Sequence, residues 1–310
     1  MSIIERAVRR LRPGGVKEAS RAGEILPKPE PVSPIPALRS AHPQWEPSRR
    51  SDSPGRSVTG IEGPSDKIDL ARLERAGMIV PDGRRTQISE EFRIIKRALV
   101  QNVKRRDSAA HRSSNLILVT SAFPNEGKTF SSINLAISMS RELDHSVLLV
   151  DADVARPQRG DFLGLRPRKG LIDLLLDPGV SLEKTTIRTN VERLDVLLAG
   201  PPHHHANELL ASESMSRLLN RLAAQGPERI VIFDAPPLLV TTEAGTLAHQ
   251  AGQVVMVVEA GKTTQAALKS ALAQLEGCSV FGILNKSTGG LNEDMQNYGY
   301  RYSETGHQHV

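Results

Sequence analysis

Six short apolar runs constrain the fold of this chain more than any other feature. Each run is four or five residues long, and segments with helical spacing of apolar residues separate them. They span residues 116–119, 147–150, 194–198, 230–233, 254–258 and 281–284. Strands that are apolar almost throughout are buried on both faces, as in a parallel sheet covered by helices. We therefore predict an α/β fold with a mainly parallel sheet flanked by helices.

The size and composition of the chain allow this fold. A length of 310 residues suits one large α/β domain with extra segments, or two small domains, and 39% of the residues are hydrophobic. No apolar run approaches the roughly 18 residues of a membrane span, and the first twelve residues lack the apolar segment of a signal peptide. The single cysteine, Cys278, rules out an internal disulfide framework. We expect a cytoplasmic protein that reaches a membrane through a partner or a surface contact.

The first 66 residues differ from the rest in composition. They hold ten of the 20 prolines, which disfavour both helix and sheet, and predict a disordered, partly extended arm. Apolar residues in the first eleven positions follow helical spacing among arginines. This pattern indicates a short basic amphipathic helix that docks on an anionic membrane or a partner, although a frayed terminus is equally compatible.

Residues 67–112 are predicted to form a helical oligomerisation or regulatory segment, 113–290 the main domain and 291–310 a flexible tail. An apolar stripe of Ile88, Phe92, Ile95 and Leu99 marks a long helix. Residues 84–112 carry nine Lys or Arg against three Asp or Glu, whereas the last twenty residues carry one Arg against three acids. The basic helix and acidic tail either attract one another or form ordinary solvated surfaces.

Residues 122–129 read as a phosphate-binding loop between the first strand and a helix. Backbone N–H groups at the start of such a helix, together with the helix dipole, favour an anion. We expect Lys128 to reach the β- and γ-phosphates of ATP and the Thr129 hydroxyl to bind Mg²⁺. Ala122 stands where a glycine is usual, so this position must form the turn without glycine's conformational freedom. The predicted nucleotide contacts are Ala122, Pro124, Asn125, Glu126, Gly127, Lys128, Thr129 and Phe130.

Three aspartates follow predicted strands. Asp151 and Asp153 come directly after the run at 147–150, and Asp234 follows the run at 230–233. Carboxylates at positions i and i+2 point the same way, and ligands bind at the carboxyl edge of a parallel sheet. Each aspartate alone is compatible with a helix cap or a turn. Together with the loop they predict a Mg²⁺–ATP site, with Thr129, Asp153 and Asp234 as metal ligands.

All three tyrosines of the chain lie within five residues of the tail: Tyr298, Tyr300 and Tyr302. A phosphate-binding loop joined to a tyrosine tail indicates that the tail accepts phosphate. The alternative is an aromatic edge strand, because the three positions share one strand face. The run His203–His205 is compatible with metal binding, but adjacent imidazoles rarely converge on one ion, and we expect this segment to shape the start of the next helix.

Four segments carry a resemblance to a known family: TSAFPNEGKT at 120–129, residues 134–136, LLVDADVARP at 148–157 and IVIFDAPP at 230–237. They resemble the bacterial protein-tyrosine kinases of polysaccharide-export systems, which are P-loop enzymes related to deviant-Walker, partitioning-type ATPases. The resemblance covers roughly residues 85 to 302. The stretch at 88–97 looks like the branch found in exosortase-associated exopolysaccharide loci.

The resemblance implies an ATP- and Mg²⁺-dependent tyrosine autokinase that regulates exopolysaccharide synthesis or export. Lys128, Asp151 and Asp153 would be its catalytic residues, with Asp151 near the attacking hydroxyl and Asp153 near the metal. The tail tyrosines would be phosphorylated in trans by a neighbouring protomer. Glu90, Arg93 and Lys96 match a motif that builds a ring oligomer, with Lys96 replacing an arginine that binds in a bidentate way. The family also implies a separate membrane polysaccharide co-polymerase as activator and a cognate tyrosine phosphatase.

Two other functions are alternatives to this one. A partitioning or positioning ATPase shares the predicted fold but usually carries a lysine early in the loop, where this chain reads Ala122-Phe-Pro-Asn. A nucleic-acid module is disfavoured because carboxylates beside the loop repel phosphate backbones. Twelve residues separate Lys286 from Tyr298, which is roughly 40 Å of extended chain, so length alone leaves phosphorylation in cis open.

Overall fold

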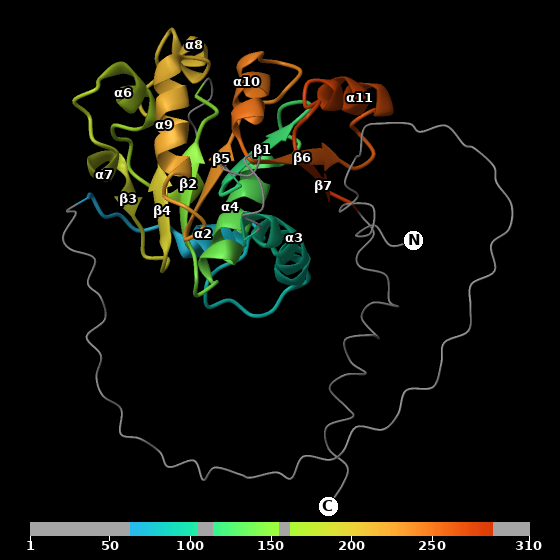
Figure 1. The fold of residues 1–310 in the computed structure, drawn as a ribbon. Helices are drawn as coiled ribbons and strands as arrows, with labels where there is room; N and C mark the ends of the chain where they lie inside the picture. Colours follow the sequence, from blue (N-terminus) through green and yellow to red (C-terminus); the bar gives the residue numbers. More distant parts are fainter. Residues whose placement is uncertain (1–62, 105–113, 155–161, 288–310) are drawn as a thin grey trace, which may run out of the picture. The chain divides into compact units, whose positions relative to one another are not determined.

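The computed structural model describes residues 63–104, 114–154 and 162–287. The proline-rich arm up to residue 62, its basic amphipathic start and the tyrosines of the tail lie outside these residues. Within them, a seven-stranded sheet forms the centre of the domain in the order β3–β4–β2–β5–β1–β6–β7 (Figure 1). The strands are β1 (Leu116–Ser121), β2 (Ser146–Asp151), β3 (Ile187–Arg188), β4 (Leu194–Leu197), β5 (Arg229–Asp234), β6 (Gln253–Glu259) and β7 (Val280–Asn285).

The six predicted strands are confirmed, and all of their pairings with one another are parallel. The prediction missed β3, which pairs antiparallel with β4 through Ile187 and Arg188. Two residues are too few to show a strand periodicity in the sequence. Beside β3, Ser65 forms a parallel bridge with Arg188, and the Asp66 carboxylate accepts a hydrogen bond from Arg168 at 2.8 Å. Residues 65 and 66 therefore lie against strand β3 of the sheet.

Helices cover both faces of this sheet (Figure 1). They are α2 (Leu70–Arg75), α3 (Gln87–Lys104), α4 (Lys128–Ser140), α6 (Leu171–Leu176), α7 (Leu182–Thr185), α8 (Ala206–Leu210), α9 (Glu213–Ala223), α10 (Glu243–Gln250) and α11 (Gln265–Ala273). The strands alternate between two apolar clusters, as their twofold periodicity requires. In β1, Ile117 packs with α3 and α4 on one face, whereas Leu118 packs with α9 and α10 on the other. The predicted α/β arrangement is thus confirmed.

Helix α3 follows the stripe predicted from the sequence. Phe92 and Leu99 are buried, and Ile88 and Ile95 are half-buried against the same core as the sheet. Helix α4 lies under α3 and is buried almost all round, which its serine-rich sequence permits because small side chains allow close packing. The long basic helix is therefore part of the main domain's core.

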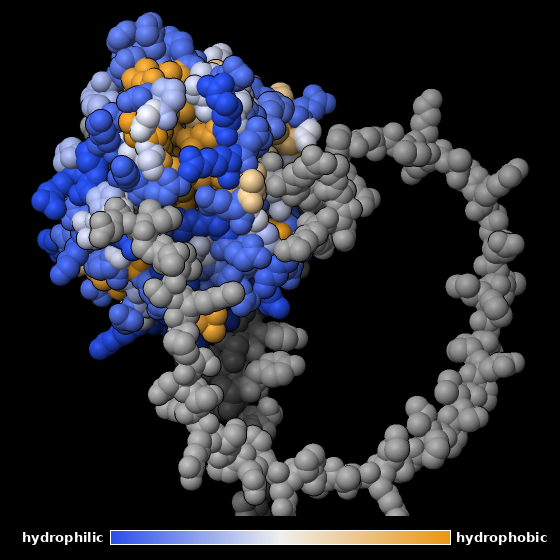
Figure 2. Space-filling model, turned by 60° about the vertical axis from the view of Figure 1, so that its left-hand side comes forward, coloured by the Kyte–Doolittle hydropathy of each residue, from blue (hydrophilic) through white to orange (hydrophobic). Residues whose placement is uncertain are grey.

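The face of the molecule seen in Figure 2 is mainly hydrophilic, with apolar patches among the polar side chains. The large apolar side chains exposed on the described part of the chain are Phe123, Leu143, Leu176, Val240 and Leu284. Among the described residues, no helix combines the length and the apolar character that crossing a membrane requires.

Candidate phosphate-binding and catalytic site

The predicted phosphate loop connects β1 to α4 at the carboxyl edge of the sheet. Its two left-handed residues are Asn125, with φ 66°, and Gly127, with φ 103°. Asparagine tolerates this region better than most residues, and glycine adopts it without steric cost. Ala122 is fully buried and has no positive φ, so the loop turns without glycine at its first position. The strand, loop and helix predicted from the sequence are all present.

Lys128 lies in the first turn of α4, with only 5% of its side chain exposed. Its Nζ lies 3.8 Å from Oδ2 of Asp153, whose side chain is 7% exposed. An ammonium group removed from water needs a compensating negative charge, and Asp153 supplies one. The structure thus brings together two of the three predicted catalytic residues.

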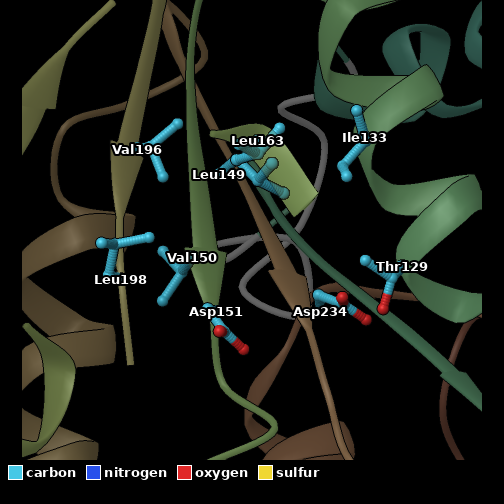
Figure 3. Close-up of a pocket in the computed structure, with 9 residues that line it drawn as sticks. All are labelled: Thr129, Ile133, Leu149, Val150, Asp151, Leu163, Val196, Leu198 and Asp234. Carbon is cyan, nitrogen blue, oxygen red and sulfur yellow. The ribbon is translucent and has the colours of Figure 1, made fainter. Parts of the chain in front are cut away.

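Asp151 and Asp234 occupy equivalent positions at the ends of β2 and β5, where they are register partners. Together with Thr129 they line one small pocket, which Ile133 and residues of β2 and β4 close with apolar side chains (Figure 3). Figure 3 shows the Thr129 hydroxyl and the Asp234 carboxylate directed toward each other, with Asp151 at the same edge. The pocket measures about 10 Å³. That is room for about one water molecule, so a nucleotide would lie outside it, along the loop.

The oxygen atoms gathered here suit magnesium. Carboxylates and a hydroxyl are hard ligands of the kind Mg²⁺ prefers, and the predicted ligands Thr129 and Asp234 line the same pocket. In the described part of the chain, no three His, Cys, Asp or Glu side chains form an all-protein metal cluster. Mg²⁺ at nucleotide sites is usually held by one or two carboxylates, phosphate oxygens and waters. The donor set therefore fits a metal that binds together with the nucleotide.

Glu126 sits in the middle of the loop, and its carboxylate points into the protein. One oxygen accepts the Phe123 N–H at 2.9 Å, and the other accepts the Thr263 hydroxyl. The side chain, 2% exposed, therefore stabilises the loop itself. Only the backbone of Glu126 is left to contact a phosphate, which refines the nucleotide contact predicted for this residue.

Three residues that the sequence reasoning missed hold the loop from the side of β6 and β7: Thr263, Asn285 and Lys286. Asn285 Nδ2 donates to the Glu126 carbonyl at 2.9 Å, and Lys286 Nζ donates to the Asn125 carbonyl at 2.8 Å. One signal in the sequence pointed to them. Asn285 and Lys286 directly follow the last apolar run, so they emerge at the same edge of the sheet as the loop.

Comparisons with known proteins show which family this chain belongs to. No protein-family model matches the sequence. The tyrosine-protein kinase YwqD of Bacillus subtilis (strain 168) is 33% identical over 200 residues, which are 64% of this chain and 80% of that protein. The chain belongs to the bacterial tyrosine-protein kinase family. A solved structure, the chimerical protein CapA2B2, superposes with a TM-score of 0.59 at 27% identity and covers 73% of this chain and 95% of the other.

The succinoglycan biosynthesis transport protein ExoP of Rhizobium meliloti (strain 1021) is 29% identical over 250 residues, which are 78% of this chain and 29% of that protein. Other long relatives also match over only about a quarter of their length. The fold is therefore the α/β P-loop NTPase fold of the bacterial tyrosine-protein kinases, and it corresponds to one part of these longer relatives.

The residues predicted to build an oligomer, Glu90, Arg93 and Lys96, divide into two environments on α3. Arg93, 68% exposed, forms an ion pair with Glu90 one turn earlier. Lys96, 13% exposed, turns toward α4, where its Nζ donates to the Ser138 carbonyl at 2.9 Å and lies 2.6 Å from Glu142 Oε1. Glu90 and Arg93 therefore lie at the surface, whereas Lys96 makes its contacts inside the domain, between α3 and the end of α4.

Of the remaining predicted residues, Pro124 lies in the loop and the three tyrosines lie outside the described residues. Phe130 is half-buried and packs on the α3 side of the core. The run His203–His205 precedes α8, and the rings of His203 and His204 stack with their centroids 4.4 Å apart. Cys278 is half-buried against the core, and burial raises the pKa of its thiol.

Proposed function

We propose that this protein is an ATP-dependent tyrosine autokinase that transfers the γ-phosphate of ATP to Tyr298, Tyr300 and Tyr302. The observation that carries the proposal is the buried Lys128–Asp153 pair beside the register-paired Asp151 and Asp234, at the start of a helix in a bacterial tyrosine-kinase fold. All tyrosines of the chain lie in one short segment that follows β7 in sequence.

In the proposed reaction, the tyrosine Oη attacks the γ-phosphorus, the bond from that phosphorus to the β–γ bridging oxygen breaks, and ADP leaves. Asp151 accepts or orients the proton of the hydroxyl, whose ordinary pKa is about 10. Lys128 stabilises negative charge on the phosphate oxygens. Mg²⁺ held by Thr129, Asp153 and Asp234 would supply further positive charge to those oxygens. Phosphoryl transfer consists mainly of such positioning and charge stabilisation.

We further propose that the kinase regulates exopolysaccharide synthesis or export. The match to a succinoglycan biosynthesis transport protein supports this role. From the sequence at 88–97 we also propose that the chain belongs to the exosortase-associated branch, and the neighbouring genes of the locus would test this. As partners we propose a separate membrane polysaccharide co-polymerase as activator, a cognate tyrosine phosphatase and further copies of this chain. The cell compartment we propose is the cytoplasm, at the inner face of the membrane.

Phosphorylation of all three tyrosines would add roughly −4.5 to −6 charges to the tail. A tail that reaches the acidic site of a neighbouring protomer would then be repelled, so we propose that phosphorylation changes assembly. Sizing of phosphorylated protein and of the Tyr298, Tyr300 and Tyr302→Phe variant at equal concentration tests this idea. Identical assemblies would count against it.

Incubation of the purified chain with γ-labelled ATP and Mg²⁺, followed by a phosphotyrosine blot, tests the proposed activity. We expect label on the wild type and none on Lys128→Met or on the triple Tyr→Phe variant, while the triple variant still binds ATP. ATP hydrolysis without any phosphotyrosine on the wild type would instead support a partitioning-type ATPase. Label that persists in the triple Tyr→Phe variant would place the acceptor elsewhere.

A further inference from the structure

The residues at the end of β7 bind the phosphate loop from outside the loop's own sequence. Asn285 donates to the Glu126 carbonyl and Lys286 to the Asn125 carbonyl, across 159 and 161 positions of sequence. We call Asn285 and Lys286 the β7-end pair. Strands β1, β6 and β7 are neighbours in the sheet, which brings the pair beside the loop (Figure 1).

These two hydrogen bonds fix the direction of two peptide planes. No described peptide bond is cis, so each carbonyl points opposite to the N–H group of the next residue. With its carbonyl held by Lys286, Asn125 directs the N–H of Glu126 away from the pair. In the same way, the bond from Asn285 to the Glu126 carbonyl directs the N–H of Gly127 away. Both N–H groups belong to the stretch of a P-loop that binds phosphate oxygens.

Gly127 shows how closely the pair fits the loop. A Cβ atom at this position would lie 1.9 Å from Asn285 Nδ2, far inside van der Waals contact. Gly127 also has a positive φ of 103°, which disfavours any side chain. The close approach of Asn285 thus adds a second, independent reason for glycine at this position of the loop.

A second layer of contacts holds the pair and the loop together. Lys286 Nζ lies 3.1 Å from Glu259 Oε1. The Thr263 hydroxyl accepts the Glu259 N–H at 3.1 Å and donates to the Glu126 carboxylate. The contacts therefore form a closed network from the loop through the β6–α11 connection to the end of β7.

We propose that Asn285 and Lys286 are positioning residues for phosphoryl transfer, which hold two loop carbonyls outward so that the N–H groups of Glu126 and Gly127 face the nucleotide phosphates. The proposal rests on the proposed kinase function, because it assumes that the loop binds a nucleotide. When the loop already has its binding shape, the nucleotide does not have to supply the free energy that orders it. Removing the pair should therefore reduce the affinity for any nucleotide that carries a β-phosphate.

Calorimetric titration with ADP and Mg²⁺ measures this effect without relying on catalysis. We expect Lys286→Met and Asn285→Ala each to weaken Mg²⁺–ADP binding about tenfold, since each removes a hydrogen bond that orders the loop. Lys286→Arg keeps a charged donor and should recover most of the affinity. With ATP as substrate, Lys286→Met should raise KM more than it lowers kcat, because the loop binds phosphates in the ground state as well as in the transition state.

Lys262→Met is the matched control. It also removes one positive charge and one ion pair to Glu259, but Lys262 does not reach the loop carbonyls, so Mg²⁺–ADP affinity should stay within about twofold of the wild type. Equal weakening in Lys262→Met and Lys286→Met would trace the effect to charge alone and overturn the proposal. Wild-type affinity in folded Lys286→Met would also overturn it. Because Lys286 is exposed, this variant tests the proposal even if Asn285→Ala fails to fold. A wild type that binds no Mg²⁺–ADP would overturn the proposed function itself.

Discussion

Asp151 at the end of β2 and Asp234 at the end of β5 are direct register partners across two adjacent parallel strands. Neighbouring strands lie about 4.8 Å apart, so two carboxylates emerge side by side at the edge of the sheet. Like charges at this spacing repel one another unless cations lie close. The Lys128 ammonium at the same edge and a bound Mg²⁺ would supply the positive charge that this pair needs.

Exchanging Asp151 for asparagine separates its proposed chemical role from binding. Asp151→Asn keeps the shape of the side chain but removes the proton acceptor, so autophosphorylation should fall about 10²- to 10⁴-fold. The affinity for Mg²⁺–ADP should change much less. Asp177→Asn, at an exposed turn where the carboxylate accepts the Gly179 N–H, serves as control and should leave the rate unchanged. Full autophosphorylation of Asp151→Asn at saturating ATP and Mg²⁺ would show that this assignment is wrong.

Gly127→Ala should abolish measurable nucleotide binding. The new methyl group meets Asn285 Nδ2, and the positive φ of 103° adds strain of about 1–2 kcal/mol. Gly277→Ala makes a matched control, because Gly277 has a φ of 84° but open space around its Cβ position. This control should lose a similar amount of stability and keep its nucleotide affinity. Wild-type affinity for Mg²⁺–ADP in Gly127→Ala would contradict the tight fit between loop and strand.

Two basic residues of α3 should behave differently when replaced. Lys96→Met leaves the Ser138 carbonyl and Glu142 without their ammonium partner and should lower the free energy of unfolding by about 1–3 kcal/mol. Arg93→Met at the exposed surface should cost at most about 1 kcal/mol, yet it should shift the oligomer toward monomers if this face forms a ring contact. Urea unfolding and sizing distinguish them. The reverse outcome, with Lys96→Met altering assembly and not stability, would contradict the division seen on α3.

A mixture of two inactive variants tests which protomer phosphorylates the tail. Lys128→Met protein supplies an intact tail without a functional loop, and protein that lacks residues 291–310 supplies the loop without tyrosines. We expect phosphotyrosine to appear on the Lys128→Met chain only after mixing. Each variant alone with ATP and Mg²⁺ is the control. Absence of phosphotyrosine in the mixture would eliminate transfer between protomers.

The carboxylate that supports the β7-end pair should make stability depend on pH. Burial raises the pKa of Glu259, but hydrogen bonds and charges from Lys286 and Lys262 outweigh this effect and lower the pKa below its ordinary value of 4.5. A lowered folded-state pKa stabilises the protein above pH 4.5, and this contribution is lost as the pH falls through the folded value. The difference in urea midpoint between wild type and Glu259→Gln should therefore shrink below pH 4.5. A difference that grows on acidification would contradict this sign.

Local sequence patterns were enough to predict most of the fold. The six apolar runs predict their strands because parallel strands buried on both faces consist almost entirely of apolar residues. The stripe from Ile88 to Leu99 predicts α3 because a helix buried along one side repeats its apolar residues at helical spacing. Strand β3 escaped notice because Ile187 and Arg188 owe their conformation to pairing with β4, a tertiary contact that leaves no periodicity in two residues.

The candidate site was predictable in part. Lys128, Thr129, Asp151, Asp153 and Asp234 could be found because a motif and strand ends mark them, and the structure gathers them at one edge of the sheet. The run before Asn285 marks its place at the edge of the sheet, but its hydrogen bond to the loop and the role of Glu126 within the loop could not be predicted. These contacts depend on which strands become neighbours in the sheet. No local pattern encodes a contact between residues that are 159 positions apart in sequence.

The wide separation in sequence between the loop and the β7-end pair has a consequence for the synthesis of the chain. A nascent polypeptide that has emerged through Asp234 already contains the loop, its lysine and all three aspartates, but β7 and the residues that hold the loop have yet to leave the ribosome. The loop reaches its final shape only once residues 285 and 286 have docked. Nucleotide binding in that shape therefore begins only after residue 286 has been made, and the segment carrying Tyr298, Tyr300 and Tyr302 is translated next.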